Sequence, residues 1–190
     1  MPQPDHISVF DLPDLETLDE ETRAYFDICI EKLGLVPNVL QTFSRDQEKL
    51  KTFSAYYNQL MLADSGLSKL EREMVAVVVS CVNRCYYCLV AHGNAVRKLS
   101  GDPDLGEMLV MNYRVAKLDS RQRAMLDFAW KLTAEPWSVD ESDRQALRDV
   151  GLTDGELFDL ADVIGFFNMS NRFAIATDMM PNREYHAMDR

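Results

Sequence analysis

Two cysteines and a histidine form the most reactive cluster in the sequence. Cys85 and Cys88 are separated by two residues, and His92 follows four positions after Cys88. On one helix these three side chains would fall within a stripe of ~60°, because each residue turns the helix by ~100°. A thiolate is the reactive form of cysteine, and a nearby imidazole can accept its proton or stabilise it. The second thiol can trap an oxidised first thiol, so the spacing predicts redox chemistry.

Glu73 is a further candidate for the same site, although it lies twelve residues before Cys85. Twelve residues span ~18 Å along an unbroken helix, which is too far for contact. Asn83 interrupts the apolar pattern, however, and a break there lets the first helix fold back against the second. We therefore expect Glu73 beside His92, where a carboxylate orients the imidazole and accepts a proton.

The elements that must position these residues are all expected to be helices. The run from Val75 to Val79 is β-branched and suits a buried strand, but it continues a segment capped by Ser68 and Glu71 and has no partner strand. Apolar periodicity, caps and Gly or Pro breaks predict helices at about 20–32, 37–43, 47–63, 68–82, 84–99, 104–113, 120–133, 141–149 and 154–178. The sequence thus predicts an all-α, single-domain bundle of about eight helices over residues 1–190, with 1–18 irregular.

Two segments of the chain resemble each other. The segments that begin at Ser68 and at Thr153 each contain a cap, an apolar run and then a polar cluster. The cluster is Asn83-Arg84-Cys85 in the first segment and Asn168 to Arg172 in the second. Two registers fit equally well, so an internal duplication and a chance likeness of two buried helices both remain open.

Composition and charge exclude several classes of function. The chain has 31 acidic and 20 basic residues and a net charge of -11, which argues against nucleic-acid or anionic-membrane partners. No apolar stretch approaches the roughly 20 residues of a membrane span, and the N-terminus lacks signal-peptide features. Three of the four cysteines lie within eight positions, unlike the scattered pairs of a secreted disulfide scaffold. We expect a cytoplasmic protein.

Other interpretations of the cysteines fit less well. Structural zinc needs four ligands, whereas the sequence offers only Cys85, Cys88 and His92. Haem attachment would need a histidine at the position of Leu89. No metal or other cofactor is therefore expected. Cys29 and Cys81 are expected to be buried, small apolar residues. Candidates for the substrate pocket, with core packing as the alternative, are Tyr87, Phe166, Phe167, Asn168 and Arg172.

The pattern Glu73, eleven residues, Cys85-x-x-Cys88, three residues, His92 resembles the active-site signature of the alkyl hydroperoxidase D family, within the carboxymuconolactone decarboxylase superfamily. The resemblance extends over nearly the whole chain. It points to the peroxidase-related branch through the segments Leu35-Val36-Pro37-Asn38, Phe167 to Arg172 and Asn182 to His186. The best-known members carry a histidine where this chain has Tyr87, which puts the efficiency of proton transfer in question.

The resemblance implies a homo-oligomeric peroxidase that reduces hydroperoxides with a dithiol donor, either a lipoyl-bearing or a thioredoxin-like protein. It makes Cys88 the attacking thiol, Cys85 the resolving thiol, and Glu73 with His92 a proton relay. Helix-dipole reasoning favours instead the thiol nearest the helix N-terminus, Cys85, as the thiolate. A lyase like the superfamily's namesake and a non-enzymatic thiol redox sensor or relay are the alternatives. Lyases of that kind resemble this chain without its dithiol.

Overall fold

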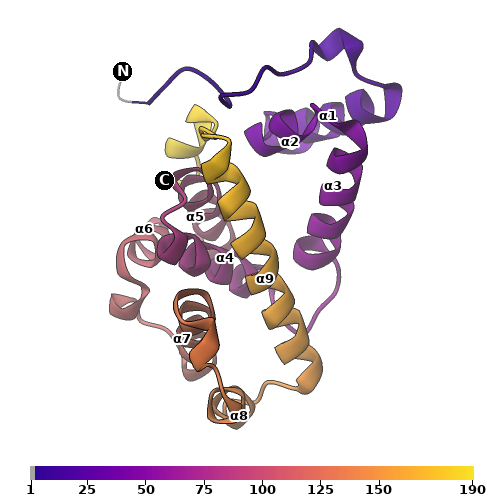
Figure 1. Ribbon diagram of the computed structural model, residues 1–190. Coiled ribbons are helices and arrows are strands. Elements are labelled where there is room, and N and C mark those ends of the chain that lie inside the picture. The colour runs from indigo at the N-terminus through magenta and orange to yellow at the C-terminus, as the bar shows by residue number, and fades with distance from the viewer. Residues whose placement is uncertain (1–2) are drawn as a thin grey trace.

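A computed structural model describes residues 3–190, and its regular secondary structure is entirely helical in that range (Figure 1). This confirms the all-α prediction. The α-helices are α1 (Glu20–Leu33), α2 (Asn38–Phe43), α3 (Gln47–Leu62), α4 (Lys69–Asn83), α5 (Tyr86–Ser100), α6 (Pro103–Asn112), α7 (Ser120–Ala134), α8 (Glu141–Asp149) and α9 (Asp154–Ala176). Short 3-10 turns are η1 (Leu15–Thr17), η2 (Tyr113–Val115), η3 (Pro136–Ser138) and η4 (Arg183–His186). No helix of the described chain is long and apolar enough to cross a membrane.

Helix α4 forms the centre of the core. It begins with the predicted capping box, in which the Ser68 side chain accepts from the Glu71 backbone and the Glu71 side chain accepts from the Ser68 backbone. Every side chain from Met74 to Ser80 is fully buried, because α5, α6, α7 and α9 pack around the helix. The β-branched run is therefore helical, as expected: burial on all sides outweighs its intrinsic preference for strands.

The first three helices lie on the other side of α9 from α7 and α8 (Figure 1). Aromatic rings join them to α9: Phe43 of α2 stacks on Phe53 of α3 and on Phe173 of α9, with centroid distances of 4.2 and 4.4 Å. Phe53 also contacts Phe166 of α9 at 5.4 Å. These contacts hold α2 and α3 against α9.

The two ends of the described chain meet. The backbone N–H of Val9 donates to the carbonyl of Thr177, and the N–H of Met180 donates to the carbonyl of Ile7. The Asn182 side chain accepts from the backbone N–H of Asn38 at 2.8 Å and donates to the carbonyl of Val36 at 2.9 Å. This amide therefore ties the C-terminal segment to the start of α2.

Candidate active site

The site is built where α4 stops. Arg84 adopts a left-handed conformation with φ of 55°, which ends α4 and reverses the chain. The next residue, Cys85, is the N-cap of α5, and its sulfur accepts from the backbone N–H of Cys88 at 3.4 Å. The predicted break near Asn83 is thus confirmed, but Cys85 caps the second helix instead of lying within it.

The two sulfur atoms are in direct contact. Cys85 Sγ and Cys88 Sγ are 2.7 Å apart, and both residues are almost completely buried. The hydrogen bond between the two sulfur atoms lowers the pKa of Cys85, with the Cys88 backbone N–H acting in the same direction against the effect of burial. The same sulfur-sulfur hydrogen bond, followed by burial, raises the pKa of Cys88 well above its ordinary value. The first negative charge of the pair is thus favoured on Cys85, at the helix N-terminus.

A buried polar cluster lies behind Cys88. Hydrogen bonds from Asn171 and Ser80 to its sulfur act to lower the pKa of Cys88, and both residues are fully buried. The Asn171 side chain also donates to the Ser80 hydroxyl at 3.1 Å and accepts from the Asn83 side chain at 3.1 Å. Polar groups from α4 and α9 therefore hold the Cys88 sulfur in addition to Cys85.

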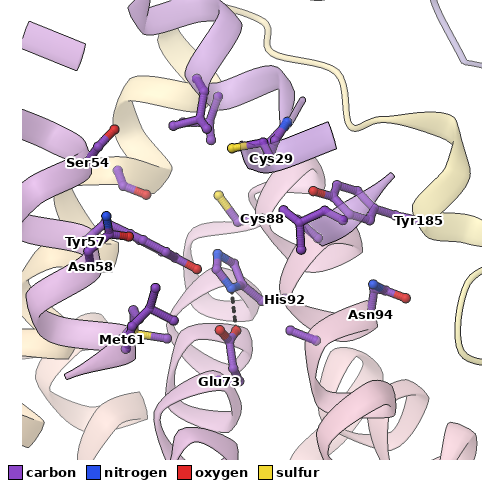
Figure 2. Close-up of a pocket in the computed structure, with 18 of the residues that line it drawn as sticks. Cys29, Ser54, Tyr57, Asn58, Met61, Glu73, Cys88, His92, Asn94 and Tyr185 are labelled. Carbon is purple, nitrogen blue, oxygen red and sulfur yellow. Dashed lines mark hydrogen bonds and ion pairs between the residues drawn. The ribbon is translucent and has the colours of Figure 1, made fainter. Parts of the chain in front are cut away.

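Glu73 and His92 form the contact expected from the sequence. Glu73 Oε2 lies 2.6 Å from His92 Nδ1, because α4 and α5 pack side by side after the break. The imidazole and the Phe167 ring pack at 80° to each other with centroids 4.6 Å apart, which helps to fix the orientation of the imidazole. Figure 2 shows His92 between Glu73 and Cys88, with the second ring nitrogen on the Cys88 side. Glu73, His92 and Cys88 therefore form a line along one wall.

That wall faces a cavity of about 530 Å³ enclosed by α1 to α5, α9 and η4. Cys88 lines the cavity and Cys85 does not, so a molecule inside it meets only one of the two sulfur atoms. The other lining side chains are mainly apolar or aromatic, among them Tyr25, Ile28, Leu33, Leu40, Phe53, Tyr57, Met61, Leu62, Leu99 and Phe166. A volume of this size suits a small organic molecule.

The weaker sequence candidates divide into two groups. Tyr87, Phe166 and Phe167 line the cavity, and the Tyr87 hydroxyl accepts from the backbone N–H of Val39 at 3.2 Å. Asn168 and Arg172 do not line it. The Asn168 side chain accepts from Asn83 and Arg172 and donates to Thr133, so it joins three elements on the other side of α9.

The structure adds residues that the sequence interpretation did not place at the site. Cys29 of α1, Tyr57 of α3 and Tyr185 of η4 line the same cavity as Cys88. Burial raises the pKa of all three. Cys29 was expected to be only a buried apolar residue, and the structure brings its thiol to the cavity wall. Cys81 has no such access: its sulfur donates to the carbonyls of Leu109 and Val110, and burial raises its pKa to about 11.

Among residues 3–190, no three His, Cys, Asp or Glu side chains lie close enough together to hold a metal ion. The reactive groups of the site are thus the dithiol, the imidazole and the carboxylate. Such a set can exchange protons and can cycle between two thiols and a disulfide.

Comparison with known proteins identifies the family of the chain. Residues 47–129 match the model of the carboxymuconolactone decarboxylase family. A peroxidase-related protein from Silicibacter sp. TM1040 is 60% identical, with 100% of each chain covered and a TM-score of 0.96. A peroxidase-related protein from Ralstonia eutropha JMP134, described as an alkylhydroperoxidase AhpD core, is 40% identical over 98% of each chain, with a TM-score of 0.95. No curated protein gives a significant match.

The fold is shared more widely than the sequence. The debrominase Bmp8, solved with 2,3,4-tribromopyrrole, has 15% identity and a TM-score of 0.80, covering 95% of this chain and 96% of its own. The fold and the matched segment define an all-helical enzyme family. The chain belongs to the carboxymuconolactone decarboxylase family, in the AhpD-like, peroxidase-related group of its two most similar neighbours named above.

Proposed function

We propose that the protein is a thiol-dependent peroxidase that reduces hydroperoxides through a cycle of the Cys85–Cys88 pair. The observation that carries this proposal is the difference between the two sulfur atoms. Cys88 faces the cavity in line with His92, while Cys85 touches it from behind at 2.7 Å. A pair of this kind has one sulfur for the substrate and one for closing the disulfide.

The proposed cycle begins with the transfer of the Cys88 proton to His92, while Cys85, whose pKa is lowered, is the charged member of the resting pair. The Cys88 thiolate attacks the terminal oxygen of a hydroperoxide, the O–O bond breaks, and the alkoxide takes a proton from His92 and leaves as an alcohol. Cys88 is now a sulfenic acid. Cys85 attacks its sulfur, water leaves, and a disulfide forms. Glu73 stabilises the imidazolium between these proton transfers.

A second substrate must restore the dithiol. We propose an external dithiol, lipoyl-bearing or thioredoxin-like, that opens the disulfide by two thiol exchanges and becomes a disulfide itself. The sum converts one hydroperoxide and one dithiol into an alcohol, water and the oxidised donor. The cytoplasmic location expected from the sequence would supply such a donor.

We also propose a homo-oligomer. Met111 and Val115 are 84% and 65% exposed, and Met108 on the same helix as Met111 is also exposed. Three large apolar side chains at one end of α6 and in η2 suit a contact between copies of the chain. Light scattering after size exclusion measures the number of subunits.

Mass spectrometry after one equivalent of hydroperoxide tests the proposed cycle. We expect a Cys85–Cys88 disulfide in the wild type and, in Cys85→Ala, a sulfenic acid at Cys88 with no catalytic turnover. Cys88→Ser is expected to abolish dithiol-dependent turnover, while the control Cys81→Ser, whose sulfur lies outside the cavity, keeps it. Unmodified cysteines would favour a lyase, and a disulfide without turnover would favour a redox sensor.

A further inference from the structure

Three lysines line the active-site cavity. They are Lys32 of α1, Lys69 of α4 and Lys98 of α5, out of seven lysines in the whole chain. All three are exposed, so their ammonium groups lie at the solvent side of a cavity whose deeper part is apolar. A chain with a net charge of -11 thus gathers positive charge at this opening.

These lysines are not used in structural ion pairs. None of the three has a salt bridge or a side-chain hydrogen bond to another residue of the described chain. Elsewhere Lys49, Lys51 and Lys131 are paired with carboxylates, at 3.1, 3.0 and 2.7 Å respectively. The charges at the cavity therefore remain available to a ligand.

Each of the three lysines also lies within six residues of a polar group that lines the cavity. Lys32 follows Cys29 by three residues, and Lys69 precedes Glu73 by four residues. Lys98 follows His92 by six residues. At ~1.5 Å per residue, these spacings correspond to roughly 5–9 Å along each helix axis. Each of the three helices therefore carries an inner polar group and an outer lysine on the same cavity.

Two carboxylates also line the cavity, and each lies near a basic side chain. Glu73 is occupied by its contact with His92 at 2.6 Å. Asp189 lies near Arg97, because its charge acts to raise the pKa of that guanidinium. With Glu73 bound to His92, three ammonium groups and one carboxylate face the solvent side, so the opening favours an anion.

We infer that the cavity accepts an amphipathic organic anion, an apolar chain that carries a carboxylate. This inference rests on the proposed function for the reaction itself: the substrate would be a hydroperoxide of such an acid. The carboxylate lies among Lys32, Lys69 and Lys98, while the apolar chain fills the cavity and brings the peroxide group to Cys88. Desolvated apolar surface supplies most of the affinity, and the lysines select the charged head.

Calorimetric binding of sodium decanoate to the reduced protein tests this inference without any turnover. We expect the triple variant Lys32→Gln/Lys69→Gln/Lys98→Gln to bind decanoate roughly tenfold more weakly, since each exposed charge contributes about two- to threefold. The uncharged probe decan-1-ol should bind both proteins equally. Lys117→Gln is the matched control, because this exposed lysine has no ion pair within residues 3–190 and does not line the cavity.

Equal affinity of decanoate for the wild type and the triple variant would overturn the inference, as would equal weakening by Lys117→Gln. The single variant Lys69→Gln repeats the test with minimal disturbance of the fold. Kinetics separate the two proposals. If peroxidase activity exists, KM for a fatty-acid hydroperoxide should rise in the triple variant with kcat unchanged, and KM for its methyl ester should not. If the wild type binds decanoate in this way but shows no peroxidase activity, only the peroxidase proposal is refuted.

Discussion

Helices α4 and α9 begin alike and end differently. Both start with a complete capping box, at Ser68 and Thr153, and both contribute a buried face to the core. Asn83 and Asn168 each lie fifteen residues beyond the respective cap, and their side chains are hydrogen-bonded to each other at 3.2 Å. The matching capping boxes and the equal spacing fit the register in which Ser68 corresponds to Thr153. Helix α4 stops at Asn83, however, whereas α9 continues to Ala176.

The difference shows how the reactive half of the site arises. The left-handed Arg84 ends α4, so that Cys85 caps a new helix and α5 returns alongside α4 with His92 next to Glu73. The unbroken α9 provides no reactive group. Its Phe167 holds the imidazole and its Asn171 holds the Cys88 sulfur. The comparison therefore assigns chemistry to α4 and α5 and support to α9, and each half can be tested separately.

Of the two halves, the larger effect is expected on α4, at Glu73. Glu73→Gln keeps a hydrogen-bond acceptor for His92 Nδ1 but removes the charge, so hydroperoxide turnover should fall about 100-fold. The matched control is Glu71→Gln, two residues away on α4, where the side chain belongs to the cap. We expect near wild-type steady-state rates for this control. Equal losses in both variants would mean that the carboxylate of Glu73 has no role beyond folding.

A smaller effect is expected at Asn171 on α9. Asn171→Ala removes a hydrogen bond that lowers the pKa of Cys88, so this pKa should rise and reactivity at pH 7 should fall about tenfold. The measurement is the pH dependence of Cys88 alkylation in a Cys85→Ala background. Asn168→Ala on the same helix, which loses the Asn83 contact, should keep the original midpoint. An unchanged midpoint in both variants would make Asn171 a purely structural residue.

Much of this arrangement was predictable because its signals are local. The capping boxes at Ser68 and Thr153, the helical reading of the valine run, and the break at Asn83 were each inferred from a few neighbouring residues, and the structure confirms them. The contact between Glu73 and His92 followed from that break. Their catalytic roles remain predictions, because they depend on chemistry that folding alone does not test.

The distant parts of the site could not be inferred in this way. Cys29, Tyr57 and Tyr185 reach the cavity from three separate elements. Helical periodicity predicts which face of a helix is buried, but not which element packs against that face. Asn168 was a pocket candidate, yet its side of α9 faces Asn83 and Thr133. The sequence does carry a signal for Asn171, because this polar residue lies at helical spacing from the buried Ile164 and Phe167.

The capping box of α9 also predicts a pH effect. Hydrogen bonds from the Thr153 backbone and hydroxyl, with Arg121, lower the pKa of Glu156 from 4.5 to about 2. A lowered native pKa stabilises the fold above the unfolded value, so this stability is fully present above about pH 4.5 and is lost as the pH falls towards 2. Glu156→Gln should therefore flatten the dependence of the unfolding free energy on pH in this range. A slope identical to that of the wild type would contradict the role of this cap.

The smallest expected effect concerns Arg84, the residue that separates the two helices. The left-handed conformation of Arg84, with φ of 55°, costs about 1–2 kcal/mol in the folded state. Glycine removes this strain, but part of the gain is lost because glycine makes the unfolded chain more flexible. Arg84→Gly should thus raise the free energy of unfolding by about 0.5–1 kcal/mol, measured by urea denaturation, with turnover unchanged. Gly101 ends α5 at φ of 66° with open space around its Cα, so Gly101→Ala should lower it by a similar amount. If Arg84→Gly instead reduced turnover without loss of stability, the rigidity of this turn would matter to the dithiol itself.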